Sequence, residues 1–291
     1  MKKPLFTGAC TALVTPFLNG QINFPLLERL IRRQIEAGIK AIVVCGTTGE
    51  SATLSDLEKL KLIASAKKYA GTDCRIIAGT GSNSTDHMVA LCKAAEDAGA
   101  DGLLIVSPYY NKATPEGLVQ HYSAAAGAVH LPVIVYNVPS RTGLDIPASV
   151  YAKLAHIPNI IGVKEAKADL GKVLETRAQC PEDFYIWSGN DDLTVPFLSL
   201  GGKGVISVLA NLYPEMTQAM ARAALDGDFD TAAELQIRFQ PLLQVLFREV
   251  NPVPVKAAMK LLGFDCGECR LPLTPASEET VKKLKNLLPP Q

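Results

Sequence analysis

The sequence has no excess of charge of either sign, no long apolar run and few histidines. Its 291 residues include 29 Lys and Arg against 29 Asp and Glu, so net charge gives no reason to expect binding to nucleic acid or an anionic membrane. No apolar stretch reaches the ~18–20 residues that a membrane-spanning helix requires. We therefore expect neither a nucleic-acid nor a membrane partner, but small-molecule ligands and further copies of the same chain.

Residues that form metal sites or disulfides are also sparse. The four histidines are scattered and lack the close spacing of metal ligands. The seven cysteines are odd in number and scattered, which is unlike a disulfide framework and favours a cytoplasmic location. Cys266 and Cys269 have metal-ligand spacing, but there is no second cysteine pair and no nearby histidine, so we expect no metal centre.

Apolar residues are abundant and follow a regular rhythm. They make up 48% of the chain, which is ample for a large core. Short, β-rich apolar runs alternate with stretches of helical periodicity. The runs with strand character are 8–14, 41–45, 75–78, 102–106, 132–136, 160–163, 184–187 and 204–208.

Eight alternating units favour a closed (β/α)8, or TIM, barrel. Strands that are apolar almost throughout are typical of a parallel sheet covered by helices on both faces. The spacing is also compatible with an open, doubly wound sheet. The lack of a G-x-G-x-x-G motif after the first run argues against the dinucleotide-binding form of that sheet.

Helix boundaries can be predicted from local signals. Ser55 and Glu58 have the spacing of a capping box, and Gly71 lies where the helix that follows them should end. After Gly227 the alternation stops. Three helical patterns then follow with no strand between them, at 229–249, 253–263 and 277–288. We expect a catalytic barrel at 1–227 and an all-helical extension at 228–291 that packs against the barrel or a neighbouring subunit.

Lys164 is the most informative candidate for chemistry. Barrel enzymes carry their reactive groups at the carboxyl ends of the strands, and Lys164 ends one predicted strand. Burial removes water from a lysine ammonium and favours the neutral amine, which attacks ketones to form a Schiff base. An ion pair with Glu165, or with an aspartate across the barrel, is an equally good interpretation of this position.

Four further side chains are expected on the same rim, each with an alternative. Thr47 and Thr48 lie in a turn suited to a carboxylate or phosphate, or cap the next helix. Tyr136 is placed to exchange protons beside Lys164, or fills the barrel mouth. The planar guanidinium of Arg141 matches a carboxylate, or is a solvated surface group. Their convergence on one rim favours a site.

These residues lie in segments that together resemble a known family. The segments are GTTGES (46–51), PYYNK (108–112), YNVPSRTG (136–143), GVKEA (162–166), SGND (188–191), GVISV (204–208) and NPVPVK (251–256). From about Phe6 to Gly263 the chain resembles the dihydrodipicolinate synthase family. That family belongs, with N-acetylneuraminate lyase, to the pyruvate-dependent class I aldolases.

The resemblance implies catalytic roles for four residues. Lys164 matches the lysine that forms a Schiff base with pyruvate. Tyr136 matches the tyrosine that shuttles protons. Thr48 matches the hydroxyl that links this tyrosine to a second one, which is Tyr110 here. In the family that second tyrosine reaches in from the neighbouring subunit.

It also implies substrate contacts. Thr47 and Thr48 match the groups that bind the pyruvate carboxylate, and backbone groups at Gly189 and Ile206 match the lining of the pyruvate pocket. Arg141 matches the arginine that receives the carboxylate of the second substrate, L-aspartate 4-semialdehyde. Sialic acid lyases lack an arginine at this place in the loop.

The activity implied is condensation of pyruvate with L-aspartate 4-semialdehyde to 4-hydroxy-tetrahydrodipicolinate, in lysine and diaminopimelate biosynthesis. The resemblance implies no metal or organic cofactor, and a homotetramer built as a dimer of dimers. Two alternatives remain. One is a related pyruvate aldolase or lyase acting on another aldehyde, and the other is a non-catalytic barrel that senses a keto acid.

One group of residues departs from the family pattern. Members inhibited by lysine bind it in a pocket whose positions are matched here by Ser51, Ala52, Leu54, Asn83 and Tyr109. The glutamate that receives the lysine amine is replaced by His87, and two histidine positions are Asp56 and Lys59. We therefore expect weak or absent inhibition by lysine.

Overall fold

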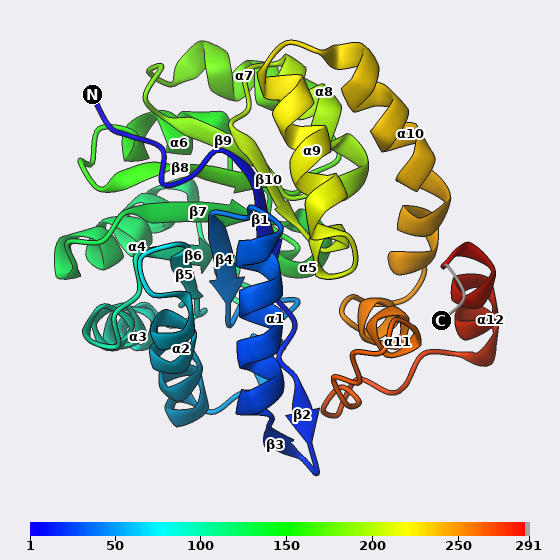
Figure 1. Ribbon diagram of the computed structural model, residues 1–291. Helices are drawn as coiled ribbons and strands as arrows, with labels where there is room; N and C mark the ends of the chain where they lie inside the picture. Colours follow the sequence, from blue (N-terminus) through cyan, green and yellow to red (C-terminus); the bar gives the residue numbers. More distant parts are fainter. Residues whose placement is uncertain (289–291) are drawn as a thin grey trace.

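The computed structural model describes residues 1–288 and has a closed barrel of parallel strands at its centre (Figure 1). The strands are β1 (Gly8–Ala12), β4 (Ala41–Val44), β5 (Arg75–Gly79), β6 (Gly102–Val106), β7 (Val133–Asn137), β8 (Ile160–Glu165), β9 (Tyr185–Ser188) and β10 (Gly204–Ser207). Neighbours follow the chain order, and β1 pairs with both β4 and β10 to close the barrel. The predicted (β/α)8 barrel is confirmed, and the open sheet is wrong.

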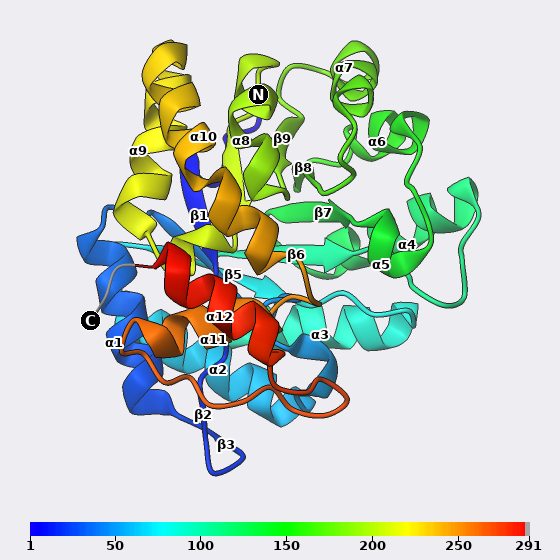
Figure 2. The same cartoon turned by 90° about the vertical axis from the view of Figure 1, so that its right-hand side faces the viewer.

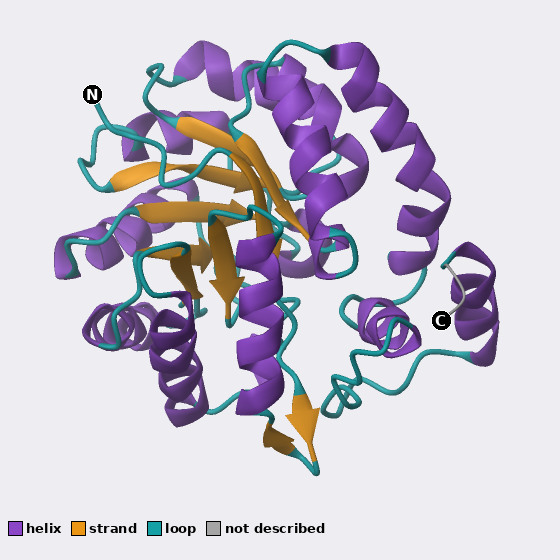
Figure 3. Ribbon diagram, in the orientation of Figure 1, coloured by secondary structure: helices purple, strands orange, loops and turns teal. Residues whose placement is uncertain are grey.

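Helices surround the strands on the outside of the barrel (Figure 3). They are α1 (Phe24–Glu36), α2 (Asp56–Ala70), α3 (Thr85–Asp97), α4 (Pro115–Ala128), α5 (Pro139–Thr142), α6 (Ala148–Leu154), α7 (Leu170–Gln179), α8 (Thr194–Ser199) and α9 (Pro214–Leu225). The predicted capping box begins α2, since the Ser55 amide donates to Glu58 at 2.9 Å and the Glu58 amide donates to the Ser55 hydroxyl. Gly71 ends that helix with a φ of 57°, which glycine adopts without a Cβ penalty.

A small hairpin was not expected from the sequence. It pairs β2 (Phe17–Leu18) with β3 (Gln21–Ile22) in antiparallel fashion and directly precedes α1. Asn19 and Gly20, with φ of 52° and 76°, form the turn between them. Strands of two residues are too short to give an alternating apolar pattern, which is why the pattern does not predict them.

The amino-terminal end of the barrel is filled by side chains and by the first residues of the chain. Phe6 stacks on Trp187 with ring centroids 5.2 Å apart, and the Trp187 indole donates to the Phe6 carbonyl at 3.3 Å. The Lys2 ammonium donates to two backbone carbonyls, those of Ala155 and Ile160, at 2.5 and 2.7 Å. This packing leaves the opposite, carboxyl end of the barrel for the site.

The C-terminal helices are α10 (Phe229–Leu246), α11 (Val253–Leu261) and α12 (Glu278–Leu287). Figure 2 shows them together on one side of the barrel, far from α4. The three predicted helices are confirmed, with slightly earlier ends. The division into 1–227 and 228–291 stays a prediction, and residues 289–291 of its second part lie outside the described residues. Within residues 1–288, no helix has both the length and the apolar character needed to cross a membrane.

A buried ion pair attaches α11 to the turn after β4. The Lys256 ammonium lies 2.6 Å from the Glu50 carboxylate, and the two side chains are 3% and 1% exposed. The second Glu50 oxygen accepts from the Arg270 backbone amide at 2.8 Å. Breaking one partner of such a pair costs about 3–5 kcal/mol, because the other charge is left buried alone. The extension is therefore fastened to the mouth of the barrel.

A second buried network joins the ends of β7 and β8. The Asn137 amide donates to both Glu165 oxygens, at 2.8 and 3.1 Å, and the Tyr151 hydroxyl donates to one of them at 3.1 Å. The Lys167 amide donates to the other oxygen at 2.8 Å. These hydrogen bonds lower the pKa of the Glu165 carboxyl, but burial has the larger effect and raises the pKa to about 7.

The Glu165→Gln variant is predicted to flatten the pH dependence of stability. From the ordinary pKa of 4.5 up to about 7, the folded chain holds the Glu165 proton more tightly than the unfolded chain does. This carboxyl therefore contributes fully to the free energy of unfolding below pH 4.5. As pH rises from 4.5 to about 7, the contribution is lost, by on the order of 3 kcal/mol at most. Urea denaturation at several pH values measures the slope.

Exposed Glu116 supplies the control, since its side chain is 64% exposed. The Glu116→Gln variant should keep the wild-type slope. Parallel stability curves for wild type and Glu165→Gln between pH 4.5 and 7 would contradict the prediction, whatever their offset, because the lost hydrogen bonds change the height of the curve and not its slope.

Candidate active site

A cavity of about 690 Å³ opens at the carboxyl end of the barrel. Gly46 and Thr47 line it after β4, Gly81 after β5, and Tyr136 at the end of β7. Asn251, from the link between α10 and α11, also lines it. Because all eight strands run in parallel, segments far apart in the sequence deliver their side chains to this one rim.

Lys164 and Tyr136 form the centre of the candidate site. They face each other in the register of β8 and β7, and the Lys164 ammonium lies 4.3 Å from the centroid of the Tyr136 ring. Both side chains are buried, at 6% and 7% exposed. The expected position of Lys164 at a strand end inside the barrel is confirmed.

The ion-pair interpretation of Lys164 is wrong. Glu165 points to the helix layer, where Asn137 and Tyr151 bind its carboxylate. Asp191, the buried aspartate near the lysine, accepts from the Ser207 hydroxyl and from the Val208 amide at 2.8 Å. Within residues 1–288, no carboxylate lies within ion-pair distance of the Lys164 amine, so the structure leaves this amine without a fixed anionic partner.

The two threonines lie in a tight turn that places backbone groups beside the cavity. The Gly49 amide donates to the Gly46 carbonyl at 3.1 Å, and the Glu50 amide donates to the Thr47 carbonyl at the same distance. Their alternative role as helix caps is wrong, because Ser55 caps α2. Thr48 is 3% exposed, and its hydroxyl accepts from the Asn251 amide at 2.9 Å.

Arg141 lies on α5, a single helical turn where the sequence predicted a loop. Its side chain lines the cavity and donates to the Asn251 backbone carbonyl at 3.1 Å. Arg141 is exposed, as its interpretation as a surface group expects, but it also borders the cavity and its guanidinium is held by this backbone partner. The charge therefore lies at the mouth, bonded to the backbone of the residue whose side chain contacts Thr48.

The structure does not bring every predicted site residue into the cavity lining, which includes Thr47, Tyr136 and Arg141 but neither Lys164 nor Thr48. Tyr110 is 93% exposed, has a φ of 71° and does not line the cavity, whereas its neighbour Tyr109 does. Ile206 is buried inside the barrel in the same apolar cluster as Tyr136. Gly189 lies against Ala166, where an added Cβ would come within 2.6 Å of the alanine Cβ. The roles given to these residues stay predictions.

Asn251 is the site residue that the sequence did not predict. It is 6% exposed, and it contacts both Thr48 and Arg141. The segment NPVPVK, which begins with it, carried part of the family resemblance, but an asparagine after a helix has no chemical signature by itself. Its position is decided by tertiary packing of the extension.

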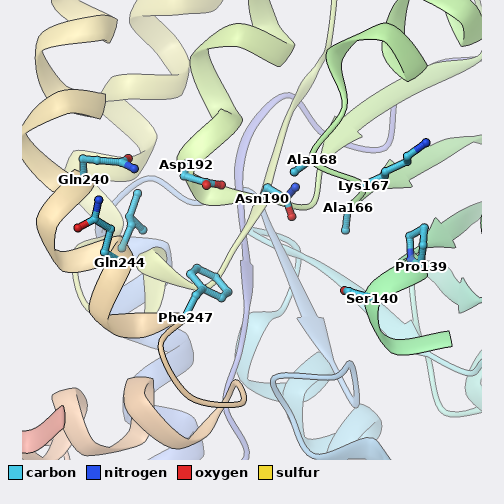
Figure 4. A pocket seen from close by; sticks show the side chains of 11 residues that line it. Pro139, Ser140, Ala166, Lys167, Ala168, Asn190, Asp192, Gln240, Gln244 and Phe247 are labelled. Atoms are coloured by element: carbon cyan, nitrogen blue, oxygen red, sulfur yellow. The ribbon is translucent and has the colours of Figure 1, made fainter. Parts of the chain in front are cut away.

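A second groove of about 390 Å³ lies beside the mouth (Figure 4). Gln240 and Gln244 line it from α10 and Phe247 from the residue directly after that helix, while Ser140 lines it from α5 and Ala166 from the loop after β8. Lys167 is also at its edge, but its ammonium pairs with Asp145 and Asp169 at 3.2 and 3.0 Å. The groove therefore offers amide and apolar groups and the carboxylate of Asp192 to a ligand.

The residues that depart from the family pattern form their own contacts at one end of the cavity. His87 Nε2 lies 2.8 Å from an Asp56 oxygen, and the Lys59 ammonium lies 3.4 Å from the other. The hydrogen bond with His87 is the largest cause that lowers the pKa of the Asp56 carboxyl. Within residues 1–288, no group of three or more His, Cys, Asp or Glu is placed to hold a metal ion.

Comparison with known proteins agrees with this architecture. The model of the dihydrodipicolinate synthetase family matches residues 5–291. A curated relative from Acetivibrio thermocellus, named 4-hydroxy-tetrahydrodipicolinate synthase, is 46% identical over 288 residues, covering 99% of this chain and 98% of its own.

Solved structures extend the likeness to three dimensions. Dihydrodipicolinate synthase from Thermotoga maritima matches with a TM-score of 0.96 and 43% identity, over 98% of both chains. The chloride-inhibited enzyme from Acinetobacter baumannii, complexed with pyruvate, matches with a TM-score of 0.95 and 42% identity, over 97% of both chains. The resemblance predicted from the sequence is confirmed: the chain belongs to the dihydrodipicolinate synthetase family.

Proposed function

We propose that Lys164 is the amine through which this chain condenses pyruvate with L-aspartate 4-semialdehyde to form 4-hydroxy-tetrahydrodipicolinate. The condensation is the activity of the family, a lyase step in lysine and diaminopimelate biosynthesis. The observation that carries the residue assignment is the buried Lys164 amine, which lies 4.3 Å from the Tyr136 ring and has no ion-pair partner among residues 1–288.

The first half of the reaction takes up pyruvate. The neutral Lys164 amine attacks the pyruvate ketone, water leaves, and an iminium forms. Thr47, Thr48 and the backbone of their turn bind the pyruvate carboxylate, and Gly189 and Ile206 line the pocket. Loss of a methyl proton then gives an enamine. The iminium itself is the electron sink for this step.

The second half joins the two substrates. The enamine carbon attacks the aldehyde of L-aspartate 4-semialdehyde, whose carboxylate is held by Arg141. The amino group of the adduct then attacks the imine carbon and displaces Lys164 as the ring closes. Tyr136 carries protons to and from these centres through the Thr48 hydroxyl. Arg141 favours this aldehyde over the sugar aldehydes of related lyases.

The proposal extends to assembly and location. Tyr110 is 93% exposed here, and the proposed relay from Thr48 is completed by the tyrosine of a neighbouring subunit, which requires at least a dimer. We assign a homotetramer built as a dimer of dimers. A cytoplasmic location is supported by the seven cysteines, each of which is a free thiol.

The Lys164→Ala variant is predicted to lose both turnover and the covalent pyruvate adduct. Wild-type protein incubated with pyruvate and borohydride should gain the mass of one reduced adduct, measured on the intact chain. The Lys167→Ala variant is the matched control, because this neighbouring lysine is engaged by two aspartates outside the cavity, and it should keep the adduct. An adduct that persists on Lys164→Ala would assign the chemistry to another group.

The Arg141→Gln variant is predicted to separate the two substrates. Removing the guanidinium should lower kcat/KM for L-aspartate 4-semialdehyde by roughly 100-fold, in line with the about 1.5–3 kcal/mol of a hydrogen bond to a charged group. The rate of pyruvate adduct formation should change little. Arg222→Gln, at an exposed helical pair, is the control. Comparable losses for both substrates would rule out the assigned role.

Inhibition by L-lysine is predicted to be weak or absent. The carboxylate that a lysine amine would need at position 87 is missing, and Asp56 is already bound by His87 and Lys59. Steady-state rates measured with increasing L-lysine test this expectation, with D-lysine as the control for ionic effects. Strong inhibition by submillimolar L-lysine would show that other groups replace the missing glutamate.

A further inference from the structure

Asn251 touches both halves of the proposed site through different atoms. Its side-chain amide donates to the Thr48 hydroxyl at 2.9 Å, and its backbone carbonyl accepts from Arg141 at 3.1 Å. The residue follows Thr48 by 203 positions and comes from the link between α10 and α11. One residue of the C-terminal extension therefore lies between the pyruvate-binding turn and the arginine.

The amide bond to Thr48 fixes the direction in which that hydroxyl can act. A carboxamide nitrogen only donates, so the Thr48 oxygen must accept from it. The single Thr48 proton is then left to donate elsewhere. Within residues 1–288, the structure gives this proton no protein acceptor, and Tyr136 and Thr47 line the same cavity as Asn251.

The other end of the carboxamide supports a functional origin. The Asn251 side-chain oxygen is buried and has no hydrogen-bond partner among residues 1–288. An unpaired buried oxygen costs about 1–3 kcal/mol, a penalty that a well-packed apolar side chain would avoid. The hydrogen bond that the Asn251 nitrogen donates to the Thr48 hydroxyl explains why an amide stands at this position despite that cost.

We infer that Asn251 is a positioning residue for the reaction, whose side-chain amide holds the Thr48 hydroxyl as a proton donor toward Tyr136 and the bound keto acid. This inference rests on the proposed function and adds to it a direction for the proton path. It also gives the side chain and the backbone of Asn251 different roles. The side chain serves the pyruvate half of the reaction, whereas the backbone carbonyl steadies Arg141 for the second substrate.

The Asn251→Asp variant gives the sharpest test, because it keeps shape and backbone but replaces the donor with an acceptor. A carboxylate would take the Thr48 proton and reverse the bond. We expect kcat and the rate of borohydride-trapped pyruvate adduct formation to fall by about 10-fold or more, which is less than the roughly 100-fold for loss of the proton-transferring group itself, because Thr48 remains. KM for L-aspartate 4-semialdehyde should stay within about twofold, since the carbonyl that holds Arg141 remains.

Asn159→Asp is the matched control at the opposite end of β8. The Asn159 amide donates to three backbone carbonyls, those of Ala126, Val129 and Leu131, so the same change removes structural bonds far from the mouth. This variant should lose stability in urea denaturation but keep kcat. If Asn251→Asp keeps wild-type kcat, the amide does not donate to Thr48 and the inference is overturned.

A double-mutant cycle with Asn251→Ala and Thr48→Val tests whether the two residues act together. If Asn251 acts through Thr48, its removal should cost little more once the hydroxyl is gone, and the losses in kcat will not add. Additive losses, or a Thr48→Val variant with full activity, would overturn the inference. Denaturation midpoints identify variants that fail to fold. If a variant of the cycle does not fold, the result for Asn251→Asp decides whether the inference stands.

The outcomes distinguish this inference from the proposed function. If wild-type protein forms no adduct with pyruvate, the assignment of Lys164 fails and so does its proton path. If the adduct forms at Lys164 but the cycle is additive, only the role of Asn251 fails.

Discussion

The register in which β7 pairs with β8 from Ile134 to Asn137, after a shift at Val133, is the constraint on which the active site depends. Tyr136 faces Lys164 and Asn137 faces Glu165, so neighbouring residues on each strand point alternately into the barrel and into the helix layer. The inner pair meets the substrates, and the outer pair is joined by hydrogen bonds. A slip of one residue would exchange the two sets, so the outer bonds hold the inner pair in place.

Most of the fold could be predicted from the sequence, because its elements have strong local patterns. Each barrel strand is built around a short apolar stretch that is almost wholly buried, and the start of α2 carries a complete capping box. The hairpin of β2 and β3 and the single turn of α5 are too short to produce a periodic signal. They are stabilised by contacts with distant parts of the chain, which a local pattern does not contain.

Part of the candidate site could be predicted because residues at the carboxyl ends of the barrel strands meet at one end of the barrel. Tyr136 and Lys164 lie near the carboxyl ends of β7 and β8, while Thr47 and Thr48 follow β4 and Arg141 follows β7. Thr47, Tyr136 and Arg141 line the cavity, Lys164 lies beside the Tyr136 ring, and Thr48 is bonded to Asn251. The partners of these groups could not be predicted. Lys164 has no acidic partner because the Glu165 and Asp191 carboxylates accept hydrogen bonds from other groups, which the sequence does not show. Asn251 belongs to the C-terminal extension, where no strand end predicts its position.

The ion pair between Glu50 and Lys256 has a consequence for the order of assembly. The two residues are separated by 206 positions, and every barrel strand precedes the second of them. Ribosomal synthesis delivers the amino-terminal part of a chain first, and this part begins to fold before the remainder emerges. The turn that carries both threonines therefore receives its anchors only near the end of translation, so a nascent barrel is catalytically immature until its extension has docked.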